Sequence, residues 1–484
     1  MWGVSAWWLG RNELPDGYQN EFLHLYTLTE VWFRLRDEGL GAAWPFLWEG
    51  YWPPGMHVVA VGAVAAFGAS LRVAVLALAL AVFPLLLATG DLGRRLGDAW
   101  TGAAAAVLLA CAPGVFGLAR RYEPNLLLVA LVAVGLWWLA RGGLRSTREA
   151  VGFGLLCAAG LLVDRVVFAL YLAGPALVWI ATEREQRRRW LVAAALTLVV
   201  AGPYYALFLS EHVGEVTSQL GGEIDASGGT QAPLPPLVAL GYYPLSWLGG
   251  DLGVPGALFV FGGLAGWIRG RRSTPAAVRR TLESALIVGL VAFSLIGKKQ
   301  PYYGLPLLVP AALMAAGGWR AVLGPRARTA VLIVLVLLGL NQVAFRSTGR
   351  APVPVDALTG GPVLGDLLGE RYVLAGPPLE LGLDLARAAE LCGDRPTLLV
   401  AEQPKEGLVL PMVRLHLDRG DVPGRTVEAE AFAERAPAAQ CLVWVGETDG
   451  ADDALVRARG RPLGGWGRHG GPRVHVYALS AGPR

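Results

Sequence analysis

The sequence has few charged residues, and this scarcity excludes most classes of soluble protein. Only 17% of its 484 residues are Asp, Glu, Lys or Arg, whereas 54% are apolar, and the mean hydropathy is +0.46. Such a chain cannot cover one hydrophobic core with a water-soluble surface. The 64 Gly and 32 Pro are spread among long apolar runs, which excludes a disordered or collagen-like chain. We therefore expect most of the chain to lie in a lipid bilayer.

Cysteine is also scarce, and no two of the four cysteines have the CxxC spacing of a zinc or redox motif. Cys111 and Cys157 lie in apolar runs, where a thiol behaves as a small hydrophobic group. Cys392 and Cys441 lie in the polar C-terminal part. They could form a disulfide if that part is outside the cytoplasm, and the sequence leaves the pairing open.

About ten apolar stretches are candidates for membrane-spanning helices, since a helix needs about 20 residues to cross the hydrocarbon core. Several are short enough that flanking residues must complete the span. The stretches are 72–90, 101–119, 124–140, 151–163, 166–181, 190–208, 253–268, 283–296, 304–318 and 328–345.

The net charge of +4 is modest and says nothing about nucleic acid, a partner that we do not expect, but the distribution of arginine predicts the orientation of the chain. Cytoplasmic loops carry an excess of Lys and Arg. Alternate turns hold 17 arginines, which marks these turns as cytoplasmic: Arg94, Arg95, Arg141, Arg145, Arg148, Arg184, Arg187, Arg188, Arg189, Arg269, Arg271, Arg272, Arg279, Arg280, Arg320, Arg326 and Arg328. The loops between them face outward, namely 120–124, 164–165, 209–252 and 297–303.

This alternation holds only if the Gly/Ala-rich run 55–69 does not cross the membrane, so we interpret it as an interfacial or half-inserted helix. Residues 1–71 then form a first extracytoplasmic loop, 72–345 the membrane domain, and 346–484 a small extracytoplasmic α/β domain. In the last of these, strands are expected at 371–375, 397–402, 441–445 and 473–478, with a helix at 378–392. The segment Met1–Gly10 is too short to cross; we favour a missing upstream helix over an aromatic interfacial anchor.

Two pairs of cations lie in outward loops, where cations should be rare. They are Arg120-Arg121 and Lys298-Lys299, the latter followed by Tyr302 and Tyr303. Cations at the membrane surface suit a phosphate carried on a lipid, because charge-assisted contacts to phosphate oxygens are strong there. The alternative is snorkelling to lipid headgroups, and the residues alone do not decide between the two.

The first outer loop contains a polar segment that could carry a general base. From about Asn20 to Leu40 the pattern predicts an amphipathic helix with Glu21 and His24 on one face. A carboxylate beside a membrane exit could take a proton from an acceptor hydroxyl. A solvated carboxylate that caps the helix is the commoner situation.

Two other outward segments remain ambiguous. Asp164-Arg165 interrupts an apolar stretch, and a mutually neutralising pair that caps a helical hairpin is slightly favoured over a polar cavity. The loop 209–252 has no Lys or Arg and could cover the acceptor site or be an ordinary flexible loop.

The order of these elements resembles the polytopic GT-C glycosyltransferases that use polyprenyl-phosphate sugars, a superfamily that includes protein O-mannosyltransferases and aminoarabinose lipid A transferases. The resemblance covers roughly residues 12–345. Four degenerate stretches carry it: Asn20-Glu21-x-x-His24; Tyr51-Trp52-Pro53-Pro54-Gly55, similar to the family's Tyr-Pro-Pro-Leu; Arg120-Arg121-Tyr122-Glu123-Pro124-Asn125, similar to its Arg…Pro-Asp; and Gly297 to Pro306, similar to its Asn-Lys-Asp-x-Arg-Tyr-Leu-Leu-Pro.

The resemblance implies inverting transfer of a sugar from a polyprenyl-phosphate donor to a hydroxyl of a lipid, glycan or protein. It implies Glu21 or Asp16 as the catalytic base, and the four cations Lys298, Lys299, Arg120 and Arg121 as the donor-phosphate site. The residues implied to line the donor and acceptor sites are His24, Glu123, Asn125, Tyr302 and Tyr303. No cofactor is indicated with certainty; a divalent metal could bind through Asp16, Glu21 and Glu123, but no ligand spacing demands one.

Two departures from the family pattern leave the activity open. Asn20 and Asn125 stand where the family usually has Asp, and Asn cannot act as a general base. The alternatives are therefore an inactive family member that serves as a scaffold, or a polytopic transporter or flippase, although no inverted repeat is evident. In each case we expect a multi-pass protein of the inner or plasma membrane, in contact with membrane lipids.

Overall fold

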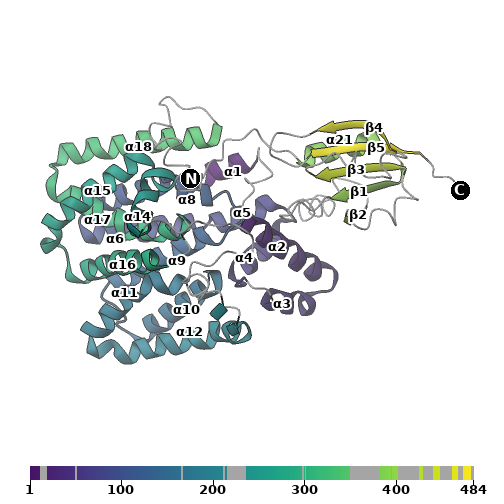
Figure 1. Ribbon diagram of the computed structural model, residues 1–484. Coiled ribbons are helices and arrows are strands. Elements are labelled where there is room, and N and C mark those ends of the chain that lie inside the picture. Colours follow the sequence, from purple (N-terminus) through teal and green to yellow (C-terminus); the bar gives the residue numbers. More distant parts are fainter. Residues whose placement is uncertain are drawn as a thin grey trace.

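The computed structural model describes residues 1–10, 19–49, 52–164, 167–210, 213–214, 236–296, 299, 301–348, 381–393, 395–401, 425–428, 440–446, 460–466 and 473–480. A large helical bundle occupies one side of the molecule and a small sheet the other, with α2, α3 and α4 on the side of the bundle toward the sheet (Figure 1). The chain is an α-helical polytopic membrane protein with a small C-terminal α/β domain, as the sequence predicts.

Each predicted span corresponds to a helix or to two consecutive helices. Within the part of the chain that the structure describes, four helical stretches are long and apolar enough to cross a membrane: Leu71–Leu96, Arg184–Leu207, Tyr302–Val322 and Pro325–Phe345. The helices of the bundle are α5 Leu71–Ala79, α6 Val82–Leu96, α7 Ala99–Cys111, α8 Pro113–Leu118, α9 Asn125–Ala140, α10 Thr147–Asp164, α11 Val167–Thr182, η1 Arg184–Gln186, α12 Arg187–Leu207, α14 Pro236–Ser246, η2 Trp247–Asp251, α15 Gly253–Gly270, η3 Arg271–Ser273, α16 Ala276–Leu295, η4 Pro301–Leu307, α17 Leu308–Val322 and α18 Pro325–Thr348.

Glycine allows the closest helix contacts in the bundle. A Cβ on Gly318 of α17 would collide with the carbonyl oxygen of Gly263 of α15, and a Cβ on Gly102 of α7 would collide with the carbonyl oxygen of Gly90 of α6. In a membrane, where lipid tails are as apolar as Leu, such close backbone contact provides much of the packing energy between helices. Gly102 and Gly318 therefore serve helix packing.

The first loop is more helical than the sequence suggests. The predicted helix at 20–40 corresponds to α2 (Gln19–Asp37), and Gly39, with φ +87°, separates it from an unpredicted α3 (Leu40–Glu49). A positive φ after a helix is a common helix stop. The remaining helices are α1 (Trp2–Leu9) and α4 (Gly55–Phe67); at 13 residues α4 is shorter than the about 20 that a span requires.

The C-terminal domain consists of α21 (Leu381–Cys392) and a sheet of order β2-β1-β3-β5-β4. The strands are β1 Thr397–Ala401, β2 Arg425–Glu428, β3 Cys441–Gly446, β4 Gly460–Trp466 and β5 Arg473–Leu479. Three of the four predicted strands and the helix are confirmed, while 371–375 lies outside the described residues. The unpredicted β2 and β4 are edge strands, where residues such as Pro462 are tolerated.

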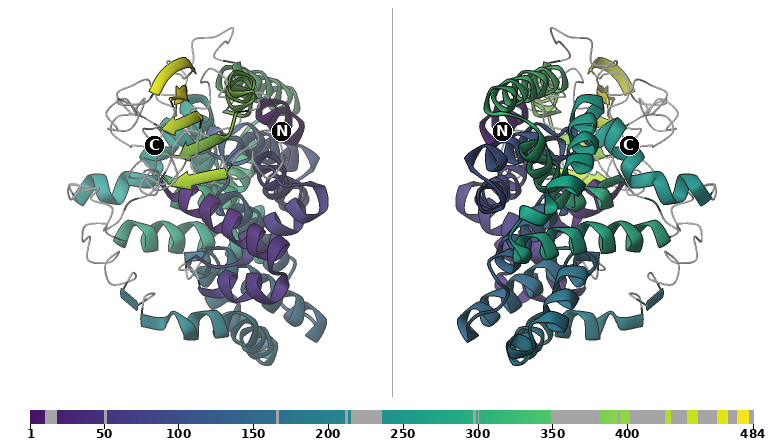
Figure 2. Two further views of the ribbon diagram at one scale, coloured as in Figure 1. Left: turned by 90° about the vertical axis from the view of Figure 1, so that its right-hand side faces the viewer. Right: turned by 90° about the vertical axis from the view of Figure 1, so that its left-hand side faces the viewer.

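A disulfide holds this domain together, and a hydrophobic cluster joins it to the N-terminal helices. Cys392 at the end of α21 and Cys441 at the start of β3 form a disulfide, with Cα atoms 5.7 Å apart. Buried residues of the sheet and of α1–α5 belong to one hydrophobic cluster. Seen from the end of the molecule, the sheet lies in front of the helices (Figure 2).

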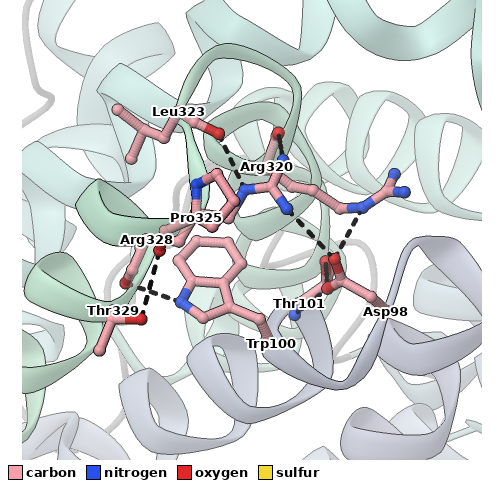
Figure 3. A network of polar contacts seen from close by, with 8 residues as sticks. All are labelled: Asp98, Trp100, Thr101, Arg320, Leu323, Pro325, Arg328 and Thr329. Atoms are coloured by element: carbon pink, nitrogen blue, oxygen red, sulfur yellow. Dashed lines mark hydrogen bonds and ion pairs between the residues drawn. The ribbon is translucent and has the colours of Figure 1, made fainter.

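The arginine-rich turns lie together at one end of the bundle. Asp98, which caps α7, accepts bonds from Arg320 (3.0 Å) and Arg328 (3.4 Å), while Trp100 donates to the carbonyl of Arg328 (Figure 3). Arg280 pairs with Glu183 at 3.8 Å. Among the other turns, the Gln186 amide bonds the backbone at 142 and 144, and Trp137 near Arg141 donates to Asp91 near Arg94. These contacts agree with the sidedness predicted from the arginine distribution.

Candidate functional site

Several predicted site residues cannot be placed. Asp16 and Lys298 lie outside the described residues, as does the side chain of Glu21, whose backbone belongs to α2. The described members are His24, Arg120, Arg121, Glu123, Asn125, Lys299, Tyr302 and Tyr303. They occur in two groups, one around the segment 120–125 and one around 299–303.

Three of the four stretches that carry the family resemblance meet in the first group. His24 of α2 is buried, and its ring lies 4.5 Å from that of Trp52, measured between ring centroids, and 5.6 Å from that of His57 in α4. Nδ1 of His57 is 3.1 Å from the hydroxyl oxygen of Tyr122. The polar helix, the Trp-Pro-Pro-Gly segment and the Arg-Arg-Tyr-Glu segment are therefore in contact at the end of the bundle opposite the arginine-rich turns.

Gly55 stands where the Tyr-Pro-Pro-Leu motif that this segment resembles has Leu, and its surroundings leave no room for a side chain. A Cβ on Gly55 would lie 2.7 Å from the carbonyl oxygen of Leu162 and 3.1 Å from a methyl group of Val163. Contacts this short with a backbone atom cannot form without a shift of one helix. The absence of a side chain therefore allows the start of α4 to pack on the end of α10.

Arg121, Glu123 and Asn125 form a buried polar chain at the start of α9. One carboxylate oxygen of Glu123 lies 3.6 Å from a guanidinium nitrogen of Arg121, and the other accepts a 3.0 Å hydrogen bond from the Asn125 amide. All three residues are buried. Burying a charge costs much less when it is paired and hydrogen-bonded, and this arrangement meets that condition for Glu123.

Arg120 is enclosed by protein. Only 1% of the residue is exposed, its guanidinium donates to the Ser347 hydroxyl at 2.5 Å, and its Cζ lies 5.2 Å and 5.4 Å from the ring centroids of Trp8 and Phe116. Burial lowers the pKa of Arg120 to about 10, so the group stays charged at neutral pH. Arg120 thus connects α1, α8 and α18 through its charge and its aromatic neighbours.

Lys299 caps the C-terminus of α16. Its Nζ donates to the carbonyl oxygens of Phe293 (2.8 Å), Ser294 (2.7 Å) and Ile296 (2.5 Å). An ammonium group has three donors, so these bonds use all of them. Burial lowers the pKa of Lys299 below its ordinary value. For Lys299 to donate to a donor phosphate, it would have to exchange one of these carbonyls.

Tyr302 and Tyr303 belong to an aromatic group beside this lysine. Their ring centroids are 4.8 Å apart, and the ring of Tyr303 lies 5.8 Å from that of Phe293. The Tyr171 hydroxyl donates to the carbonyl of Tyr303, and Nζ of Lys299 lies 5.9 Å from the ring centroid of Tyr243. Residues 236–251 of the predicted outer loop 209–252 are thus helical, and Tyr242, Tyr243 and Trp247 among them are buried, whereas its predicted mobile centre lies outside the described residues.

The structure connects the two groups through α8 and α9. Gly114 of α8 packs against Leu305 of η4 and against the buried Asp251, and α9, which begins at Asn125, also contacts η4. The described residues contain no cluster of three His, Cys, Asp or Glu side chains that could hold a metal. A metal site through Asp16 and Glu21 stays a prediction, since those side chains are not described.

Sequence reasoning missed His57 and gave Tyr122 no role. His57 lies in the run 55–69, which was interpreted from its apolar character alone. One signal could have identified it, because it is one of six histidines and stands in an otherwise apolar helix two residues after the Pro-Pro-Gly turn. The partner of Asp164 also stays a prediction; Asp164 is buried at the end of α10, but Arg165 is not described.

Comparison with solved structures shows which known fold this chain has. No family model and no curated protein matches the chain. Among solved structures, ArnT from Cupriavidus metallidurans bound to undecaprenyl phosphate superposes with a TM-score of 0.64 at 15% identity, covering 100% of this chain and 97% of that one. The apo form of ArnT gives a TM-score of 0.60 at 17% identity, covering 100% and 98%. The chain therefore has the fold of ArnT.

Proposed function

We propose that this chain is an integral-membrane glycosyltransferase that moves a sugar from a polyprenyl-phosphate donor to a hydroxyl acceptor at the outer face of the membrane. The observation that carries the proposal is the meeting of three motif stretches around His24, Trp52 and Tyr122. These stretches are distant in sequence, and each resembles a different family motif. The undecaprenyl phosphate bound to ArnT supports a polyprenyl-phosphate partner for a chain of the same fold.

The proposed reaction is a single displacement at the anomeric carbon. The acceptor oxygen forms a bond to this carbon while the bond from the carbon to the phosphate oxygen breaks. The electron pair of the broken bond goes to the departing polyprenyl phosphate, and the proton of the acceptor hydroxyl goes to Glu21 or Asp16. Lys298 and the nearby cations stabilise the negative charge that develops on the phosphate.

The contacts of Lys299, Arg120 and Arg121 indicate different roles for the four candidate cations. Lys299 and Arg120 each hold parts of the protein together, which suits fixed positive charges at the edge of a phosphate site. Arg121 is paired with Glu123 and would reach a phosphate as a member of that pair. We therefore propose that Lys298 makes the principal direct contact with the donor phosphate.

The outer-face location rests on two independent features. The 17 arginines of the turns at the opposite end favour the cytoplasmic side for that end. The disulfide between Cys392 and Cys441 suits an oxidising compartment outside the cytoplasm. For the C-terminal domain, residues 346–484, we propose a role in acceptor recognition or stability.

A second candidate function, a scaffold without catalytic activity, is favoured by Asn20 and Asn125. Asn125 uses its amide to support Glu123, which is a structural role. If the family's Asp at position 20 is the only competent base, its replacement by Asn removes the reaction and leaves donor binding.

A transfer assay separates these functions. Proteoliposomes containing the full-length protein are given a polyprenyl-phosphate sugar with a radiolabelled sugar and a set of hydroxyl acceptors, and release of label from the lipid is measured. We expect loss of transfer in Glu21→Gln or Asp16→Asn and in Lys298→Ala. Arg326→Ala is the matched control, because it removes an exposed cation at the opposite end of the bundle.

The outcomes distinguish the site from the function. Unchanged transfer in all of the site variants would refute the assigned residues. Donor binding by the wild type without transfer to any acceptor or water would favour the scaffold. Movement of the intact labelled lipid between leaflets without release of sugar would favour a flippase.

A further inference from the structure

His57 and Tyr122 form a buried contact that the proposed mechanism does not use. His57 is 1% exposed and Tyr122 is fully buried, and they come from segments 65 residues apart. Their ring centroids are 5.9 Å apart, and Nδ1 of His57 lies 3.1 Å from the Tyr122 hydroxyl oxygen. Among the described residues, Nε2 of His57 has no hydrogen-bond partner.

The chemistry of the pair defines its protonation. Burial raises the pKa of Tyr122 well above its ordinary value, so its hydroxyl keeps the proton. Burial lowers the pKa of His57 to about 3, so its imidazole is neutral at neutral pH. One hydrogen bond therefore joins Nδ1 of His57 to the Tyr122 hydroxyl, and its direction depends on the tautomer of the imidazole.

This bond affects the proposed donor site through the backbone of the segment 121–123. Tyr122 stands between Arg121 and Glu123, so fixing its side chain limits the rotations of the backbone that carries both charged groups. His57 is itself held in place, since two residues earlier Gly55 packs directly on the backbone of α10. A continuous series of contacts thus runs from α10 through α4 to the segment 120–125.

We propose that His57 and Tyr122 are a positioning pair, which sets the placement of Arg121 and Glu123 at the donor site. The inference rests on the proposed glycosyl transfer and adds two residues that act through others. Loss of the bond leaves the charges present but moves them. A misplacement of about 1 Å can lower a rate by about a hundredfold, whereas ground-state binding of a long lipid donor changes little.

The test compares four variants of the full-length protein in proteoliposomes. Tyr122→Phe removes only the hydroxyl, and His57→Phe keeps an aromatic ring but removes Nδ1. His57→Asn restores a hydrogen-bonding group, an amide that can accept or donate, near the position of Nδ1. Tyr205→Phe is the matched control, because it removes a hydroxyl that donates to the carbonyl of Leu161 at 2.9 Å, a bond between α12 and α10 that does not involve the segment 120–125.

We expect Tyr122→Phe and His57→Phe to lower kcat at least about tenfold, with KM for a polyprenyl-phosphate sugar within about threefold of wild type. Their melting temperatures should fall no more than that of Tyr205→Phe. The double variant should be no slower than the slower single variant, because both changes break one bond. His57→Asn should recover part of kcat. The proposal would be overturned if the two substitutions lowered kcat additively in the double variant. It would also be overturned if kcat fell only in proportion to the fall in melting temperature.

A second measurement separates this inference from the proposed function. Amide hydrogen exchange of a peptide that spans 118–125 reports the rigidity of the segment without any activity. Tyr122→Phe should raise exchange there, and Tyr205→Phe should not. If the wild type transfers no sugar but exchange changes as expected, the transfer function fails and the positioning contact stands. Unchanged exchange would overturn the contact in either case.

Discussion

Replacing Lys299 by Met tests whether this lysine supports the site structurally. Met has a similar length but cannot donate, so the carbonyl oxygens of Phe293, Ser294 and Ile296 lose their common partner. The first and last of these bonds are buried, whereas the bond to Ser294 is partly exposed and water can replace it.

The hydrogen bonds of Lys299 set the loss of unfolding free energy that we expect in Lys299→Met. A hydrogen bond to a charged group contributes about 1.5–3 kcal/mol, so two buried bonds would contribute about 3–6 kcal/mol. Relief of the burial of the ammonium, which is what lowers the pKa of Lys299, offsets part of this sum. We therefore expect the free energy of unfolding to fall by about 2–4 kcal/mol, with a decrease of a few degrees in melting temperature.

The assay is thermal unfolding in detergent, combined with binding of a polyprenyl phosphate. Lys298→Met is the matched control, because it makes the same change at the adjacent position. We expect Lys299→Met to melt earlier and to bind the lipid at the temperature where it is folded, and Lys298→Met to melt normally and bind weakly. A Lys299→Met protein that melts within about 1 °C of wild type but has lost lipid binding would refute the capping role and assign this lysine to the phosphate.

Three other predictions concern contacts elsewhere in the chain. Gly55→Leu, which introduces the Leu of the Tyr-Pro-Pro-Leu motif, should lower both the melting temperature and the transfer rate, because the new side chain would collide with Leu162 at the end of α10. Gly62→Leu is the control: it changes an open position of the same helix and should have little effect. Cys392→Ser should lower the free energy of unfolding of the C-terminal domain by up to about 4 kcal/mol, because the disulfide joins residues 49 apart, and limited proteolysis would detect the change; resistance equal to wild type would contradict it. Burial raises the pKa of Asp98, but hydrogen bonds from Thr101 and Arg320 outweigh this effect and hold the pKa below its ordinary value. The stability that Asp98 contributes should therefore be present above the ordinary pKa of Asp and be lost as the pH falls through the lowered pKa. Asp98→Asn should melt earlier than wild type at pH 7, and its melting temperature should depend less on acid pH.

The sequence predicted the membrane domain well because hydropathy is a local property. A run of apolar residues must be helical in lipid, where every backbone polar group needs an internal partner. For this reason the ten predicted spans all correspond to helices. The interfacial interpretation of 55–69 depended on the charges of turns more than a hundred residues away, and it stays a prediction. Elements with weak local signals, such as α3 and the edge strands β2 and β4, were missed.

The candidate site was predicted by residue type, but its contacts were not. The sequence placed Arg120, Arg121 and Lys299 at one membrane surface and assigned all of them to a phosphate. In the structure Lys299 instead bonds the carbonyls of Phe293, Ser294 and Ile296 at the end of α16, and Arg120 lies near two aromatic rings. Such partners come from folding back of the chain or from distant helices, and no periodicity in the sequence reports them.

Composition and arginine distribution alone determined that this chain belongs in a membrane and which turns share a side, because the bilayer acts on each segment independently. Only the tertiary structure decided that His57 meets Tyr122, that Gly55 rests on the backbone of α10, and that two cysteines 49 residues apart are joined. These contacts depend on how the helices pack, and packing is settled by the shapes of many side chains at once.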